Sequence, residues 1–188
     1  MKKQLPELLA PAGSFESLVA AISHGADAVY AGGSKYSARS SAENFNVEKL
    51  KEAAEYCHVR GKKLYLATNT LILDKEADEF LRYIDEIIPA CPDALILQDP
   101  GMAYRIRNLY PELPLHASTQ MSLPNSYGID WAYNNGFKRV VIARETPLAD
   151  IKDICAQQKA EIEVFMHGAL CISFSGQCLM SSMAGRRS

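Results

Sequence analysis

The sequence lacks the features that mark secreted, membrane-spanning or disulfide-stabilised proteins. Only five of its 188 residues are cysteine, and Pro6 and Glu7 interrupt the short apolar run near the amino terminus, so no signal peptide is recognisable. We therefore expect reduced thiols, with Cys57, Cys91 and Cys155 packing on or beside the apolar stripes of helices. No stretch approaches the roughly 18 consecutive apolar residues that a membrane span needs. We expect a cytoplasmic protein.

An excess of positive charge is also missing. The formal net charge is -2 and the isoelectric point is near 6.1, whereas binding to phosphates normally requires a basic face. The motif HExxH and an assembled catalytic triad are absent as well. The local basic pairs are expected on solvated helix faces or loops: Arg105/Arg107, Lys138/Arg139 and Arg186/Arg187.

Short apolar runs that alternate with amphipathic stretches dominate the chain. With 48% hydrophobic and 22% charged residues, it can bury a sizeable core. The clearest helical period runs from Ala77 to Ile88. Because a helical pattern follows each apolar run, we expect parallel strands with right-handed crossovers. The expected strands are Glu7–Ala10, Asp27–Ala31, Lys63–Thr68, Asp93–Leu97, Leu115–Ser118, Arg139–Ala143 and Ile162–Phe165.

Two α/β architectures fit this alternation, a doubly wound open sheet and a TIM-like (β/α) barrel. The barrel is favoured because the helices recur singly and because polar groups or glycine follow nearly every strand, where a barrel would bring them to one mouth. These residues are Gly13, Asn69, Asp99, Gln120, Glu145 and His167. Only about seven of the eight strands of such a barrel are found. We expect residues 1–188 to be one barrel domain, incomplete at its carboxyl end, and an N-terminal fragment of a longer protein.

The stretch from Glu163 to Ser182 concentrates reactive side chains directly after the last expected strand. Cys171 and Cys178 are separated by six residues, and thiolates bind zinc or iron–sulfur clusters, both of which need four ligands. His167 lies four residues before Cys171, so on a helical turn it could lower the pKa of that thiol. A metal site, buried structural cysteines and a catalytic thiol all remain open on spacing alone.

The same stretch, EVFMHGALCISFSGQCLMS, resembles the signature of the collagenase-like peptidases, the family numbered thirty-two among peptidases of unknown catalytic type. Further resemblances cover essentially the whole chain. They are LLAPAG at Leu8–Gly13, DAVYAGG at Asp27–Gly33 with Arg39 and Asn44-Phe45, QDPG at Gln98–Gly101 and HASTQ at His116–Gln120.

This resemblance implies a TIM-like barrel and an oxygen-independent hydroxylation activity. Members of the family act on a tRNA wobble uridine or an rRNA cytidine with prephenate as the hydroxyl source, and others act on the ubiquinone ring. Several carry a [4Fe–4S] cluster on four cysteines, and Cys171 and Cys178 match the first two ligands. Family members continue past a segment like Gly185–Ser188 into a run with the remaining ligands, so this chain could supply at most two thiolates from this site.

We therefore expect the intact protein to be an RNA hydroxylation enzyme that uses prephenate and an iron–sulfur cluster. One alternative is a ubiquinone-ring hydroxylation protein. Another is a collagenase-like peptidase, a hydrolase that uses either a Cys171–His167 pair or a metal-activated water. The third alternative is a non-catalytic half that docks on a partner subunit.

Four residues at the expected barrel mouth are candidates for binding substrate. Arg39 and Arg144 suit a small dicarboxylate, because a guanidinium fork binds a carboxylate through two hydrogen bonds. Gln120 and Asn69 are further candidates at strand ends. Salt bridges at the surface or at strand ends are the alternative role for the two arginines.

His167, Asp99 and Glu145 are candidates for proton transfer. Each follows a strand end, where a pocket can shift the pKa of a side chain. The alternative is a hydrogen bond that pins a loop.

Overall fold

The computed structural model describes residues 5–38, 45–157, 159–168 and 171–178, so Arg39 lies outside the described residues. Within them, seven strands form one sheet, all pairings are parallel, and the strand order follows the chain. A doubly wound sheet would reverse its order at a switch point, so the barrel-type expectation is confirmed. The strands are β1 (Leu9–Ala12), β2 (Ala28–Gly32), β3 (Lys63–Thr68), β4 (Ala94–Leu97), β5 (Leu115–Ala117), β6 (Phe137–Val141) and β7 (Glu161–Glu163).

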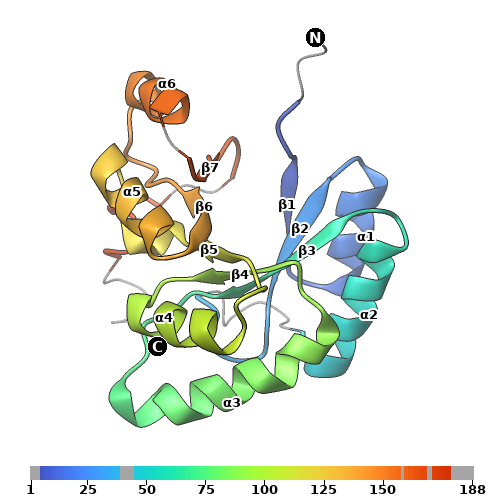
Figure 1. The fold of residues 1–188 in the computed structure, drawn as a ribbon. Helices are drawn as coiled ribbons and strands as arrows, with labels where there is room; N and C mark the ends of the chain where they lie inside the picture. The colour runs from blue at the N-terminus through green and yellow to red at the C-terminus, as the bar shows by residue number, and fades with distance from the viewer. Residues whose placement is uncertain (1–4, 39–44, 158, 169–170, 179–188) are drawn as a thin grey trace.

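Helices cover the outer face of the curled sheet, as Figure 1 shows. Four of them begin at a side chain that accepts a hydrogen bond from the first turn, at Ser14, Asn46, Asp99 and Asn125. The described helices are α1 (Phe15–Ser23), α2 (Val47–His58), α3 (Ala77–Ile87), α4 (Pro100–Leu109), α5 (Ser126–Asn134) and α6 (Leu148–Gln157), with 3-10 turns η1 (Asp74–Glu76), η2 (Ile88–Ala90) and η3 (Thr119–Met121).

The main core lies between the sheet and these helices. Leu18, Phe80 and Ile84 on the helices are fully buried against the outward side chains of the strands. The concave face of the sheet has a much smaller apolar cluster, made mostly of alanines with Tyr65 and Ile96. Outward and inward side chains alternate along each strand, so the concave face has room for polar groups.

Several features differ from the sequence-based prediction, including the bounds of β6 and β7, which were expected at Arg139–Ala143 and Ile162–Phe165. The first strand begins at Leu9, which pairs with Ala28, rather than at Glu7. Cys57 is buried as expected, but Cys91 and Cys155 are exposed. Cys91 ends η2 in a left-handed conformation, with φ of 55°, and Cys155 lies beside Ile154, the buried position of α6.

Arg139, near the centre of β6, is 9% exposed, so its expected place on a solvated face was wrong. Its neighbour Val140 packs on the helix side, which turns Arg139 into the concave face. There its Nη1 atom donates to Glu7 Oε1 at 2.7 Å, while Nε and Nη2 donate to Glu161 Oε2 at 2.9 and 2.6 Å. Since Glu7 precedes β1 and Glu161 opens β7, one guanidinium ties together the two edges of the sheet.

Glu7 is the acceptor at the centre of this interior network. Lys63 Nζ donates to its Oε2 atom at 2.8 Å, and the Tyr65 hydroxyl donates to Oε1 at 2.8 Å. Burial alone would raise the pKa of Glu7, but the hydrogen bonds from Lys63, Arg139 and Tyr65 lower it to about 2. Glu7 is therefore held ionised.

Replacing Arg139 with methionine should cost about 3 kcal/mol of unfolding free energy, because the largely buried Glu7 loses the cation that compensates its burial and Glu161 loses its ion-pair partner. Urea denaturation at neutral pH measures this. The control is Lys35→Met, which breaks an exposed pair with Glu79 and should cost less than about 1 kcal/mol. Equal losses in the two variants would contradict a structural role for the interior network.

The low pKa of Glu7 predicts a window of acid sensitivity. Its folded pKa of about 2 is below the ordinary value of 4.5, so its stabilising contribution is complete above 4.5 and is lost as the pH falls from 4.5 towards 2. In thermal denaturation between about pH 5 and 3, the midpoint of the wild type should fall more steeply than that of Glu7→Gln. His116 titrates in both proteins, so the difference between the curves reports Glu7. Parallel curves would refute the assignment.

Candidate functional site

Polar side chains link the carboxyl ends of the strands into a connected layer. Asn69, after β3, accepts a hydrogen bond from the Ala38 amide at 3.1 Å and donates to Ser118 Oγ, after β5, at 3.2 Å. Ser118 Oγ also accepts from the Gln120 amide at 3.2 Å, and Gln98 Nε2 donates to the Gln120 carbonyl at 3.3 Å. Asn69 and Gln120 therefore lie in one layer, as expected for a barrel mouth.

The segment that follows β7, residues 164–178, is called the cysteine loop below and is described at 164–168 and 171–178. Its anchor is Ser175, which is 1% exposed. The Ser175 amide donates to both carboxylate oxygens of Glu145 at 3.3 and 3.2 Å, and its hydroxyl donates to Glu145 Oε2 at 2.9 Å. The Thr119 and Ser122 hydroxyls donate to the Ser175 hydroxyl and carbonyl. The β5 and β6 strand ends therefore hold the loop.

Arg144 holds the same loop by donating hydrogen bonds to backbone carbonyls of the loop. Its Nη1 donates to the Cys171 carbonyl at 3.0 Å, its Nη2 donates to the Ser173 carbonyl at 3.2 Å, and its Nε lies 3.4 Å from Ser175 Oγ. A guanidinium has five N–H donors, so one N–H on each terminal nitrogen has no acceptor among the described residues. Carboxylate binding by Arg144 stays a prediction, and its position fixes the backbone of Cys171.

Gly176 lets the loop lie directly on the β5 end. Its φ is +74°, and a Cβ atom there would lie 2.3 Å from the Gln120 carbonyl oxygen. A residue with a side chain would therefore be strained and would push the loop away.

Glu145 and Asp99 both accept hydrogen bonds that fix the position of a loop, which is the alternative role given for them above. Burial tends to raise the pKa of Glu145, but its hydrogen bonds and the Arg144 charge lower the pKa below the ordinary value. Asp99 caps α4 by accepting from the Met102 amide at 2.9 Å, and it accepts from the Ile72 amide at 3.2 Å. Proton transfer by either residue stays a prediction.

His167 and Cys171 are both exposed, and no hydrogen bond joins them among the described residues. Cys178 is half-buried. A [4Fe–4S] cluster needs four ligands, whereas the described part of the chain contains no group of three or more His, Cys, Asp or Glu side chains suited to a metal ion. The described residues therefore do not fit a complete cluster by themselves.

Two buried polar atoms on the concave face lack hydrogen-bond partners among the described residues, and sequence reasoning missed both in this role. They are Glu163 Oε2 and His116 Nδ1. Burial and the charge of Arg139 lower the pKa of His116 to about 3, so the ring is neutral. The alternation of Glu161, Ile162 and Glu163 along β7 was the signal that could have indicated Glu163.

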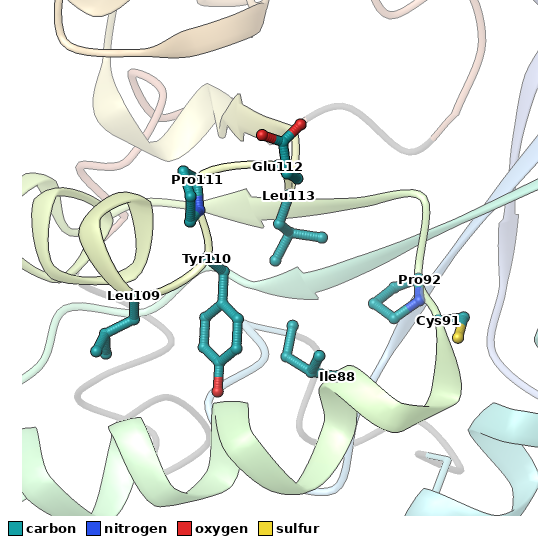
Figure 2. Close-up of a pocket in the computed structure, with 8 residues that line it drawn as sticks. All are labelled: Ile88, Cys91, Pro92, Leu109, Tyr110, Pro111, Glu112 and Leu113. Atoms are coloured by element: carbon teal, nitrogen blue, oxygen red, sulfur yellow. The ribbon is translucent and has the colours of Figure 1, made fainter.

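A cavity of about 410 Å³ lies at the opposite end of the sheet, beside the turns that precede β4 and β5 (Figure 2). In this view the side chains of Ile88, Tyr110 and Leu113 converge on it, and Cys91 lies at its edge. The described candidate residues follow the carboxyl ends of the strands, so this cavity is separate from their layer. Among the described residues, no helix combines the length and apolar character needed to cross a bilayer.

Comparison with known proteins identifies relatives over nearly the whole chain. A family profile described as Peptidase family U32 matches residues 13–188. The chain is 39% identical over 183 residues to tRNA hydroxylation protein P of Escherichia coli K12, covering 97% of this chain and 40% of the relative. It is 38% identical over 182 residues to the 23S rRNA 5-hydroxycytidine C2501 synthase of the same organism, covering 97% and 27%.

A third relative, named collagenase, comes from Porphyromonas gingivalis and is 37% identical over 188 residues, covering 93% of this chain and 44% of the relative. The chain thus spans less than half the length of each of these relatives. The solved structure of a U32 peptidase matches with a TM-score of 0.71 over 87% of this chain and 70% of that chain, at 9% identity. That likeness supports the fold.

Replacing Ser175 with alanine should loosen the cysteine loop without unfolding the sheet. It removes hydroxyl contacts with Arg144, Glu145 and Thr119, each worth about 1 kcal/mol. Amide hydrogen exchange of residues 171–178 should therefore become at least about tenfold faster. The control is Ser173→Ala, since Arg144 contacts only the carbonyl of Ser173. Equal exchange in the two variants would show that Ser175 is not the anchor.

Proposed function

Because the family profile covers residues 13–188, the chain belongs to peptidase family U32, and we propose that it acts in the hydroxylation of a base in tRNA or rRNA. Two of the relatives reported above have names of this kind, tRNA hydroxylation protein P and 23S rRNA 5-hydroxycytidine C2501 synthase. The proposal extends that RNA-directed chemistry to this chain.

One structural observation supports the proposal most directly: the cysteine loop is held over the strand ends by Arg144 and by the Glu145–Ser175 contact. The carboxyl ends of parallel barrel strands are where such enzymes place their reacting groups. Cys171 therefore has a fixed backbone and an exposed side chain at the mouth. This is the arrangement needed by a thiolate that binds a cofactor or substrate.

In the proposed holoenzyme, Cys171 and Cys178 are two of the four thiolate ligands of a [4Fe–4S] cluster. Residues other than those described must provide the remaining ligands. The cluster would provide redox chemistry, and the part of this chain is to position two thiolates.

A small dicarboxylate, prephenate, is the proposed source of the hydroxyl group. The unused N–H donors of Arg144 can bind one carboxylate, and Arg39 is the candidate for the other. Gln120 and Asn69 are polar neighbours in the same layer.

The test is production of hydroxylated nucleosides by a bacterial strain that lacks its own tRNA and rRNA hydroxylation genes. Expression of this protein should restore a hydroxylated pyrimidine, detected by mass spectrometry of digested tRNA and rRNA. Cys171→Ser should abolish the product because it removes a proposed ligand, whereas Cys91→Ser, at the opposite end of the sheet, should not.

Cleavage of gelatin by the purified protein is assayed in parallel, since one relative is named collagenase. Peptide cleavage that needs Cys171, without any hydroxylated nucleoside, would contradict the proposal and favour a thiol hydrolase. Loss of neither activity in Cys171→Ser would show that this cysteine has no chemical role.

A further inference from the structure

Three carboxylates surround the single guanidinium of Arg139, and they are not equivalent. Glu7 and Glu161 take hydrogen bonds from it at distances between 2.6 and 2.9 Å. Glu163 Oε2 lies 3.6 Å from Arg139 Nη1, which is beyond hydrogen-bond distance, and is buried without a donor among the described residues. Three of the five N–H groups of Arg139 are taken by the first two carboxylates, and Glu163 is left with a longer ion pair to Nη1.

Glu163 also lies at the carboxyl end of a strand, where barrel enzymes place their reacting groups. It is the last residue of β7, where it pairs with Val141, and the cysteine loop begins at the next residue. The side chains of Glu161 and Glu163 point to the same face of the strand. Their shared contact with Arg139 identifies this face as the concave one.

His116 Nδ1 is a second buried polar atom without a hydrogen-bond partner among the described residues, and His116 pairs in register with Arg139. It is 3% exposed, and its ring packs edge-on against Tyr65 with the ring centroids 4.8 Å apart. The Arg139 guanidinium lies 5.2 Å from the same Tyr65 ring. Thus two buried atoms, Glu163 Oε2 and His116 Nδ1, have no hydrogen-bond partner among the described residues. A buried polar atom without a hydrogen bond is costly, so Glu163 Oε2 would be stabilised by a hydrogen-bond donor.

We propose that Glu163 is the proton-holding group of the reaction site, with Oε2 placed to accept a hydrogen bond or a proton from an N–H or O–H of the substrate. This assignment rests on the proposed function, because it places the group in the same reaction. The donor belongs either to the RNA base or to the hydroxyl of the carboxylate co-substrate.

The electrostatic setting agrees with this role. Burial raises the pKa of Glu163 by more than the charge and proximity of Arg139 lower it, and Glu7 raises it further. The neighbouring strands contribute both signs of charge around it. The titratable groups of this interior network are Glu7, Lys63, Tyr65, His116, Arg139 and Glu161.

The decisive comparison is between Glu163→Gln and Glu161→Gln, two isosteric changes on one strand. A structural carboxylate is stabilising, so Glu161→Gln should lower the thermal midpoint at neutral pH because it weakens a salt bridge. Glu163→Gln should leave the midpoint unchanged or raise it, because it removes a buried carboxylate whose ionised form is disfavoured. The gain should shrink as the pH falls, since a group whose folded pKa is raised is less costly once it is protonated.

Activity provides the second readout on the same variants. Glu163→Gln should reduce kcat for nucleoside hydroxylation by at least about 100-fold and remove one limb of the pH–rate profile, while Glu161→Gln keeps kcat and the profile. A rise in KM for the RNA identifies the base as the donor, and a rise in KM for prephenate identifies the co-substrate.

Two results would overturn the assignment while leaving the proposed function intact: full hydroxylation by Glu163→Gln, or a loss of stability equal to that of Glu161→Gln. A wild-type protein that forms no hydroxylated nucleoside would instead refute the proposed function. In that case the assignment to this reaction falls with it, and the two thermal midpoints still decide whether Glu163 is structural.

Discussion

The contact of Arg139 with Glu7 and Glu161 is the interaction on which the arrangement of this molecule depends. The strands follow one another in chain order, so nothing in their pairing joins β1 to β7. One guanidinium on β6 reaches the segment before β1 and the first residue of β7 across the concave face. The curl of the sheet thus depends partly on a charge cluster, and the position of β7 sets where the cysteine loop begins.

Along the concave face, the groups that stabilise the fold and the proposed reacting group lie towards different ends of the strands. Towards the amino ends of the strands, Glu7 has three donors and a pKa of about 2, which describes a saturated structural group. Towards the carboxyl ends, Glu163 is left short of donors and its pKa is raised. Beyond the carboxyl ends, Ser175 holds the cysteine loop on the strand ends. Buried groups that are costly to the fold tend to be kept where chemistry needs them.

Much of the fold was predictable because its signals are local. The period of α3 and the apolar run of β3 were placed within a residue of their observed bounds. Errors arose where an element is defined by a distant partner: the start of β1 depends on its pairing with Ala28, and the exposure of Cys155 depends on which face of α6 meets the sheet. For the site, the places of Asn69, Gln120, Arg144 and Glu145 at strand ends were predictable because polar residues after strands are visible in sequence, whereas their roles stay predictions.

By itself, then, the sequence determined the alternation of strands and helices, the parallel barrel-type sheet, the family signature and the stretch that bears Cys171 and Cys178. Those properties follow from periodicity and from residue type along the chain. Only the tertiary structure decided that Arg139 is an interior ion-pair centre rather than a solvated charge, and that Glu163 Oε2 and His116 Nδ1 lack hydrogen-bond partners among the described residues. The physical reason is that burial and pairing of a charge depend on residues more than a hundred positions away, as Glu7 is from Arg139.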